Sequence, residues 1–309
     1  MKNSASVTGR CCGAVRAALW CTLAGIPLAH AHDAAADVVA LTARHAELRK
    51  QLSSNQFQRP LYLESSEVPG KLQGDIYALV EQPYAVVGPA LQHIDRWCDI
   101  LILHLNVKRC HTSTAQAGGA LSLHIGRKFY QPLADAFLFN FRYRMVFNQP
   151  DYLQVTLHAN EGPLGTKRYN IALEVLALDA GRSFLHLSYS YGYGMAARAA
   201  TAGYLATLGR DKVGFSIVGN QADGQPVYLD GMRGVVERNT MRYYLAIDAY
   251  LGALVVAPSE RSEKRLNDWY ASVERYPDQL HEMERGEYLD MKRREIQRQQ
   301  MPRGAGAVD

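Results

Sequence analysis

Aromatic side chains alternate with other residues along one segment of the chain, between residues 137 and 147. A period of two places alternate residues on opposite faces of a β-strand. One face of this strand would carry Phe137, Phe139, Phe141, Tyr143 and Phe147. Such a face either packs against a helix as ordinary core or forms the wall of a cavity for an apolar ligand. We predict that these five residues contact a ligand.

Two arginines lie between the aromatic residues, on the opposite face of the same predicted strand. Arg142 and Arg144 would be solvated if that face is exposed. If the register turns them inward, each guanidinium could bind a ligand carboxylate or phosphate through two parallel hydrogen bonds. Both arginines are therefore included among the predicted ligand-binding residues.

Further candidates for ligand contacts come later in the chain. Tyr191 belongs to the alternating Tyr189–Tyr193 run, which suits the entrance of a cavity but is also common at strand edges. Glu237 and Arg242 lie on adjacent turns of a predicted long helix. They form either an ordinary surface or buried salt bridge, or the polar end of a cavity that orients a ligand headgroup.

No recognised catalytic motif is present. The sequence lacks a G-x-S-x-G nucleophile elbow, an H-E-x-x-H zinc motif, a Walker loop and a dinucleotide-binding G-x-G-x-x-G in its proper context. His158 and His186 fall on predicted strands and, with Glu237, are the groups that acid–base chemistry would use. A histidine satisfied within a sheet is the more common situation. We predict no catalytic residue, no metal and no cofactor.

The N-terminal segment has the order of an export signal. Lys2, Arg10 and Arg16 precede a mostly apolar run, Ala17–Leu28, and the small-residue tripeptide Ala29–Ala31 resembles a cleavage site. The run is shorter than the roughly twenty residues that span a bilayer. A buried N-terminal helix is the competing interpretation. Cleavage after residue 31 predicts a periplasmic protein that does not span the membrane.

Removal of this segment also changes the charge and the cysteine content. Three positive charges and no negative ones leave, so the net charge falls from +4 to about +1, which argues against a nucleic-acid binder. Cys98 and Cys110 are the two cysteines that remain, and an oxidising compartment favours a disulfide between them. The alternatives are two buried thiols, or a metal site with His104 and His111.

Hydrophobic periodicity and turn residues predict the order of the structural elements. The predicted helices cover residues 33–55, 83–98, 195–208, 235–256, 260–276 and 278–300. The predicted strands cover residues 59–68, 75–80, 100–110, 121–125 and 213–218, together with four antiparallel strands joined by short turns between 137 and 191. The last nine residues are expected to be disordered.

This order of elements resembles the START-like helix-grip superfamily (SRPBCC). The resemblance runs from Gly74 to Pro258, with Gly74–Val80 as the first strand, Pro83–Cys98 as the helix behind it, Phe137–Tyr191 as the meander and Val235–Val256 as the gripped helix. It implies an α+β fold in which a curved antiparallel sheet grips a long C-terminal helix around an apolar ligand. The long Met195–Gly231 segment and the extra N- and C-terminal helices depart from the minimal domain.

The predicted organisation is therefore a signal peptide (1–31), a helix and short strand (32–73), a helix-grip domain (74–258), appended helices (259–300) and a tail (301–309). The predicted function is an exported binding or transfer protein for a lipid or other apolar small molecule. Two alternatives remain open. One is an envelope protein-interaction module that uses the charged helix 278–300, and the other is an enzyme that acts on an apolar carbonyl compound.

Overall fold

A computed structural model describes residues 34–114, 119–207 and 209–300. The predicted signal peptide and C-terminal tail lie outside the described residues. The helices are α1 (Ala34–Ser53), α2 (Tyr84–Leu91), α3 (Ile94–Leu101), α4 (Met195–Ala206), α5 (Gly231–Gly252), α6 (Arg261–Val273), α7 (Pro277–Leu280) and α8 (Arg285–Gln300). The strands are β1 (Leu61–Val68), β2 (Lys71–Val80), β3 (Val107–Ser113), β4 (Ala120–Ile125), β5 (Phe137–Asn148), β6 (Tyr152–Glu161), β7 (Lys167–Ala177), β8 (Ser183–Gly192), β9 (Ile217–Asn220) and β10 (Pro226–Tyr228).

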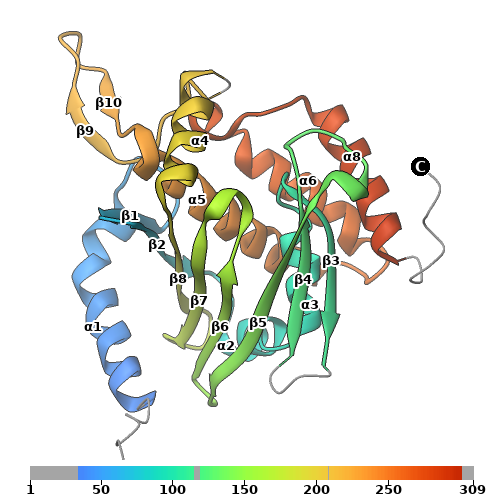
Figure 1. Ribbon diagram of the computed structural model, residues 1–309. Coiled ribbons are helices and arrows are strands. Elements are labelled where there is room, and N and C mark those ends of the chain that lie inside the picture. Colours follow the sequence, from blue (N-terminus) through green and yellow to red (C-terminus); the bar gives the residue numbers. More distant parts are fainter. Residues whose placement is uncertain (1–33, 115–118, 208, 301–309) are drawn as a thin grey trace, which may run out of the picture. The chain divides into compact units, whose positions relative to one another are not determined.

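One antiparallel sheet of eight strands organises the chain between Leu61 and Gly192. The strands lie in the order β1-β2-β8-β7-β6-β5-β4-β3, and β9 and β10 form a separate hairpin (Figure 1). The predicted meander is confirmed, because β5 to β8 follow one another both in sequence and in the sheet. β2 then pairs with β8, so the first strand of the predicted domain lies beside its last.

The two faces of the sheet are covered by different helices. α5 packs on the face that we call inner, where apolar residues of the sheet and of α2, α3, α5 and α6 form the main core. α1 packs on the outer face, where its buried Leu41, Leu48 and Leu52 contact Tyr152 and Phe184. The inner face is therefore where the elements of the predicted ligand site meet.

α5 approaches β2 so closely that only glycine fits at one position of the strand. A Cβ atom at Gly74 would lie 2.4 Å from the Thr240 hydroxyl oxygen. The predicted long helix 235–256 is confirmed as α5, and this contact fixes its height above the sheet.

Two predicted elements differ from the structure in the segment between residues 83 and 110. The predicted helix Pro83–Cys98 is two helices, because His93 has an extended backbone and starts α3 in a new direction. The predicted strand Ile100–Cys110 begins only at Val107, after the end of α3 and a series of turns. Residues 100–105 are all buried, and a short apolar run does not distinguish a strand from a buried helix end.

Two later predictions were wrong in their boundaries. The predicted strand 213–218 is instead the hairpin of β9 and β10, and the predicted helix 278–300 is interrupted between α7 and α8. Within the described residues, no helix is both long enough and apolar enough to cross a membrane.

The predicted disulfide is confirmed. Cys98 on α3 and Cys110 on β3 are bonded, with their Cα atoms 5.2 Å apart and 12 residues apart in sequence. The bond joins the helices behind the sheet to the edge strand, and a loop of this length constrains the unfolded chain by roughly 3 kcal/mol.

Replacing both cysteines by alanine should therefore lower the free energy of unfolding by about 3 kcal/mol. Urea unfolding without reductant measures this loss. Reductant should lower the stability of the wild type by a similar amount and leave the double variant unchanged. A wild type that is insensitive to reductant would contradict the expectation.

Candidate functional site

Four tyrosines meet between the sheet and α5, and we call them the tyrosine cluster. They are Tyr169 on β7, Tyr189 and Tyr191 on β8, and Tyr243 on α5. The ring centroids of Tyr169 and Tyr191 are 5.2 Å apart, and those of Tyr189 and Tyr243 are 5.3 Å apart. The predicted site residue Tyr191 thus lies on the inner face and contacts other aromatic rings.

The aromatic residues of β5 extend this surface. Phe139, Phe141 and Tyr143 are buried on the inner face, as predicted, and Phe139 lies 4.8 Å from Tyr169 between ring centroids. Phe137, at the start of the strand, is 44% exposed. The inner face is therefore aromatic on β5, β7 and β8, whereas β6 between them carries aliphatic residues.

Phe147 does not share this face. The pairing of β5 with β6 shifts between Met145 and Phe147, and such a bulge reverses the direction of the side chains that follow it. Phe147 consequently packs against Tyr152 on the outer face, with ring centroids 6.1 Å apart. The inner-face position predicted for Phe147 is wrong for this reason.

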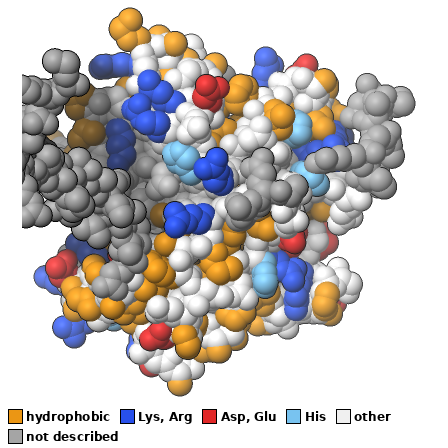
Figure 2. Space-filling model, turned by 60° about the horizontal axis from the view of Figure 1, so that its bottom comes forward, with side chains coloured by type: hydrophobic (Ala, Val, Ile, Leu, Met, Phe, Trp, Pro, Cys, Tyr) orange, Lys and Arg blue, Asp and Glu red, His pale blue; other side chains and the backbone are white. Residues whose placement is uncertain are grey.

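Arg142 and Arg144 lie on the outer face of β5 and are exposed. They are separated from the tyrosine cluster by the sheet itself. Lys, Arg and His side chains also occupy the middle of the surface seen in Figure 2, with few acidic side chains among them. The two arginines are therefore exposed and do not contact the inner face.

Glu237 holds three segments together. Its carboxylate accepts hydrogen bonds from the Ser65 hydroxyl (2.6 Å), the Phe215 amide (2.6 Å), and the amide and hydroxyl of Ser216 (2.9 and 2.6 Å). Glu237 is 0% exposed. With four donors bound, the carboxylate fixes the chain around Phe215 and β1 to α5 and has a structural role.

Arg242 is likewise engaged by the protein. Its guanidinium binds Glu282 (Nη2–Oε1 2.6 Å) and the Leu280 carbonyl (3.4 Å), and Lys128 binds the same Glu282 oxygen (2.5 Å). Burial by itself would raise the pKa of Glu282, but the neighbouring positive charges of Arg242 and Lys128 outweigh this effect and lower the pKa. The predicted polar end of the cavity is thus an ion-pair network between α5 and the α7–α8 connection.

His104 is a buried polar residue beside the tyrosine cluster that the sequence analysis did not place there. It is 3% exposed, and its ring stacks on Tyr243 with centroids 4.9 Å apart. The Asn106 amide donates to its Nδ1 (3.2 Å). A neutral imidazole that accepts at Nδ1 carries its proton on Nε2. Nε2 is buried and has no hydrogen-bond partner among the described residues, so His104 presents a free N–H donor.

The surroundings of His104 keep it neutral. Burial, followed by the positive charges of Arg242, Lys292, Lys128 and Lys108, lowers its pKa well below 6.5. The same positive charges favour a partial negative charge placed near the Nε2 proton.

Two tyrosine hydroxyls are also unused. Burial and the neighbouring tyrosines raise the pKa of Tyr189 and of Tyr243, so both are neutral donors. Within the described part of the chain, neither hydroxyl has a hydrogen-bond partner. Tyr189, Tyr243 and His104 thus offer three polar donors along an aromatic surface.

The histidines considered for acid–base chemistry lie elsewhere. His158 is exposed on the outer face and contacts Asn160. His186 is on the outer face too, where Nε2 binds Asp75 (3.0 Å) and Nδ1 binds Glu174 (2.7 Å). Neither is on the same side of the sheet as α5 and Glu237. The structure therefore does not bring His158, His186 and Glu237 together, as acid–base chemistry with these groups would require.

The stability of the His186 network should depend on pH. Burial lowers the pKa of His186, but the hydrogen bonds to Asp75 and Glu174 outweigh it and raise the pKa to about 9. A raised pKa contributes stability that is fully present below the unfolded value of about 6.5 and is lost as the pH rises through 9. Urea unfolding at pH 6.5 and 9.5 should show this loss in the wild type and a smaller one in His186→Gln. Equal pH dependence of the two proteins would contradict the role of His186.

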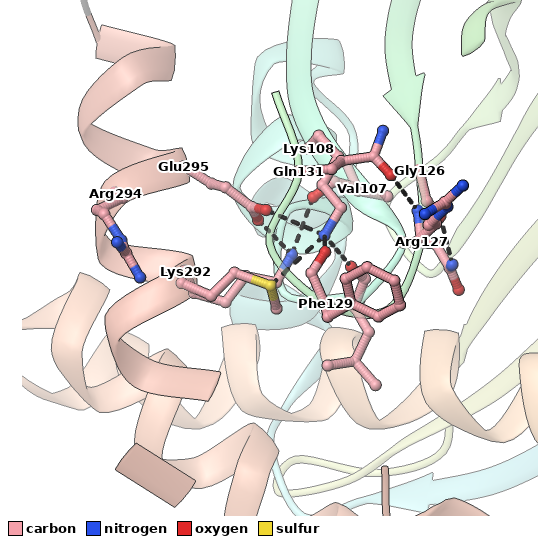
Figure 3. A network of polar contacts seen from close by, with 12 residues as sticks. Val107, Lys108, Gly126, Arg127, Phe129, Gln131, Lys292, Arg294 and Glu295 are labelled. Carbon is pink, nitrogen blue, oxygen red and sulfur yellow. Dashed lines mark hydrogen bonds and ion pairs between the residues drawn. The ribbon is translucent and has the colours of Figure 1, made fainter. Parts of the chain in front are cut away.

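α8 is fastened to the sheet edge by a second buried network. Glu295 lies between Lys108 of β3 (3.1 Å) and Lys292 of α8 (2.7 Å), as Figure 3 shows. Lys108 also donates to the Leu105 and Phe129 carbonyls, and Lys292 to the His104 and Val107 carbonyls. Two charged residues of this helix, Lys292 and Glu295, are therefore used inside the protein.

Four pockets of the described structure lie away from the tyrosine cluster. One of about 770 Å³ is lined by residues of α1, of the loop after it and of β2, and by Arg182. Others of about 510 and 280 Å³ lie beside α5–α6 and beside α3–α8. A small space of about 10 Å³ is lined by Tyr288 and by residues of α6 and α7. None of these four is the enclosed space between sheet and α5 that the sequence analysis expects.

The strand order decides the fold. Two helices follow β2, a six-stranded meander from β3 to β8 returns to pair with β2, and α5 then lies across the inner face (Figure 1). The chain has a START-like helix-grip fold. α1 and β1 before this helix-grip unit, and α6 to α8 after it, are additions.

Comparisons with known proteins add little to this description. No protein-family model and no curated protein matches the chain. Among solved structures, the Zhui aromatase/cyclase from Streptomyces sp. R1128 is 12% identical, covers 69% of this chain and 95% of its own, and has a TM-score of 0.31. Truncated norcoclaurine synthase from Thalictrum flavum is 14% identical, covers 47% and 93%, and also has a TM-score of 0.31. Nothing about ligand or activity follows at these values.

In this helix-grip unit, the residues that converge under α5 are partly those predicted and partly others. Phe139, Phe141, Tyr143 and Tyr191 were found by alternation. Tyr169 and Tyr189 lie on strands with the same alternating pattern, which could have placed them on the inner face. His104 lies in a turn with no periodicity, so only tertiary structure reveals its position.

Proposed function

We propose that this protein is an exported binding protein for a small apolar molecule that has a planar ring and at least one oxygen acceptor. The molecule would lie between the sheet and α5, against the tyrosine cluster. The observation that carries the proposal is the buried Nε2–H group of His104, which has no acceptor among the described residues and belongs to a ring stacked on Tyr243 of the tyrosine cluster.

Energetics support a ligand with oxygen atoms. A buried donor without an acceptor costs about 1–3 kcal/mol, and buried polar groups are almost always paired with protein, water or a ligand. A carbonyl or hydroxyl oxygen near Nε2 of His104 would satisfy this donor. The surrounding positive charges, Arg242 and Lys292 among them, would strengthen that hydrogen bond because the site is buried.

Geometry supports a small ring in place of the long acyl chain that the sequence analysis includes. The tyrosine rings already contact one another at 5.2–6.2 Å between centroids, so a guest must fit between rings or displace one. Aromatic pairs contribute about 0.5–1.5 kcal/mol beyond their buried area. A planar guest would gain such contacts without a large cavity.

Export is part of the proposal. The order of residues 2–31 is typical of a signal peptide, and the Cys98–Cys110 disulfide suits an oxidising compartment. Mass measurement of the protein recovered from the periplasm tests this part separately. The intact N-terminus on a cytoplasmic protein would contradict it.

Native mass spectrometry of the purified protein tests the binding proposal. We expect a non-covalent adduct that organic denaturation releases as a small ring compound. With that compound in hand, Tyr243→Phe should weaken its binding about tenfold, the value of one hydrogen bond. Tyr62→Phe removes a hydroxyl from the outer face and should leave binding unchanged. Repeated recovery of the bare protein, or equal effects of the two variants, would overturn the proposal.

A further inference from the structure

A groove of about 770 Å³ lies away from the tyrosine cluster. It lies between the end of α1, the loop that follows and the end of β2. Its lining consists of His45, Arg49, Leu52, Ser53, Ser54, Asn55, Gln58, Arg59, Pro60, Leu79 and Arg182. Pockets of about 300–1,000 Å³ hold small molecules, so the groove has the size of a ligand site.

The charge of the groove is one-sided. Three arginines and a histidine line it, and no lining residue is acidic. Arg182 is paired with Asp179 (2.7 Å), whereas the ion pairs of the described structure include none for Arg49. Burial and then the charges of Arg49 and Arg182 lower the pKa of His45. The imidazole thus experiences a positive potential, which an anion in the groove would reduce.

Arg59 is one of the residues that line the groove. Its Nη1 is buried and has no hydrogen-bond partner in the described structure. The rest of the guanidinium is held in place, because Nη2 binds Asp248 and the group lies over the Tyr244 ring, 5.8 Å from its centroid. A second pocket of about 510 Å³ is also lined by Arg59. An arginine fixed in this way can bind an oxyanion with little loss of side-chain entropy.

The wall of the groove is held in shape before any ligand binds. The Asn55 side chain donates to the Gln51 carbonyl (2.7 Å) and the Arg59 carbonyl (2.8 Å), and it accepts from the Phe57 amide (2.9 Å). Gln58 has a backbone φ of 51°, a conformation that non-glycine residues rarely adopt and that is concentrated at functional sites. The loop is therefore a fixed wall of the groove.

We propose that this groove binds a small organic anion, with its carboxylate or phosphate on Arg49 and Arg59 and its apolar part on Leu52, Pro60 and Leu79. The site is separate from the tyrosine cluster, since none of the four tyrosines lines the groove. It would serve a second ligand or an effector of the first.

The His45 ring reports directly on occupancy. An NMR titration of His45 against pH is recorded alone, with hexanoate, with hexyl phosphate and with inorganic phosphate, at ionic strength held constant with chloride. Saturable binding of hexanoate or hexyl phosphate should raise the pKa of His45. The two probes distinguish a carboxylate from a phosphate ligand, and inorganic phosphate measures the contribution of the apolar part.

Two variants that each lose one positive charge distinguish binding in the groove from nonspecific electrostatic attraction of anions. Arg49→Gln should weaken binding of the effective probe at least tenfold, whereas Lys50→Gln, at the next position of α1 and outside the groove lining, should change it less than twofold. Unfolding curves check that both variants are folded. Failure of both organic anions to move the His45 titration, or equal weakening by the two substitutions, would overturn the proposal.

Discussion

Glu295→Gln is expected to lower the free energy of unfolding by about 3–5 kcal/mol at pH 7. The carboxylate is the acidic partner of Lys108 and Lys292, and all three side chains are at most 1% exposed (Figure 3). Removing the anion leaves two buried cations next to each other, which is the costly way to break a buried ion pair. Urea unfolding measures the loss.

The pH dependence of this variant gives an independent check. Burial lowers the pKa of Lys292 to about 8 even though Glu295 opposes the shift. A lysine with a lowered pKa releases its proton more easily in the folded state, so stability increases as the pH rises above 8. The deficit of Glu295→Gln should therefore shrink at high pH. Glu287→Gln, at an exposed site on α8, should cost less than about 0.5 kcal/mol. A similar small loss in both variants would contradict the assigned role.

Glu237→Ala is expected to cost a comparable amount, about 3–5 kcal/mol. The substitution leaves two amides, of Phe215 and Ser216, and two hydroxyls, of Ser65 and Ser216, without their acceptor. Each buried donor left unpaired costs about 1–3 kcal/mol, and some of the four will reach water. Urea unfolding of the variant measures the total loss in the free energy of unfolding.

Hydrogen exchange distinguishes this role of Glu237 from ligand binding. The amides of Phe215 and Ser216 should exchange much faster in Glu237→Ala, because the contact that holds their segment to α5 is gone. Glu284→Ala, an exposed site, serves as the control. Unchanged exchange at Phe215 and Ser216, with a loss confined to ligand affinity, would show that Glu237 belongs to a binding site.

The sheet could be predicted largely from sequence because its signals are local. From Phe137 to Tyr191 the alternation of side chains and the turns at Asn148–Asp151 and Asp179–Gly181 specify each strand and its neighbour. The adjacency of β2 and β8 was not derivable from pattern, because five strands lie between them in sequence. α5 was recognisable by its length and spacing of apolar residues.

The site was less predictable, for identifiable reasons. The bulge after Met145 reverses Phe147 and leaves no mark in the alternating pattern. Charge alone does not say whether Glu237 and Arg242 face a ligand or the protein, and here the partners come from distant segments around Ser216 and Glu282. Arg49 and Arg59 become neighbours of Arg182 only through tertiary packing of α1 on the sheet.

The most direct test of the binding account is a crystal structure of the protein purified from its own compartment without added ligand. The account predicts ring-shaped electron density between Tyr189 and Tyr243, with an oxygen atom within about 3 Å of Nε2 of His104. Density for isolated water molecules alone at that position, repeated in independent crystals, would contradict it.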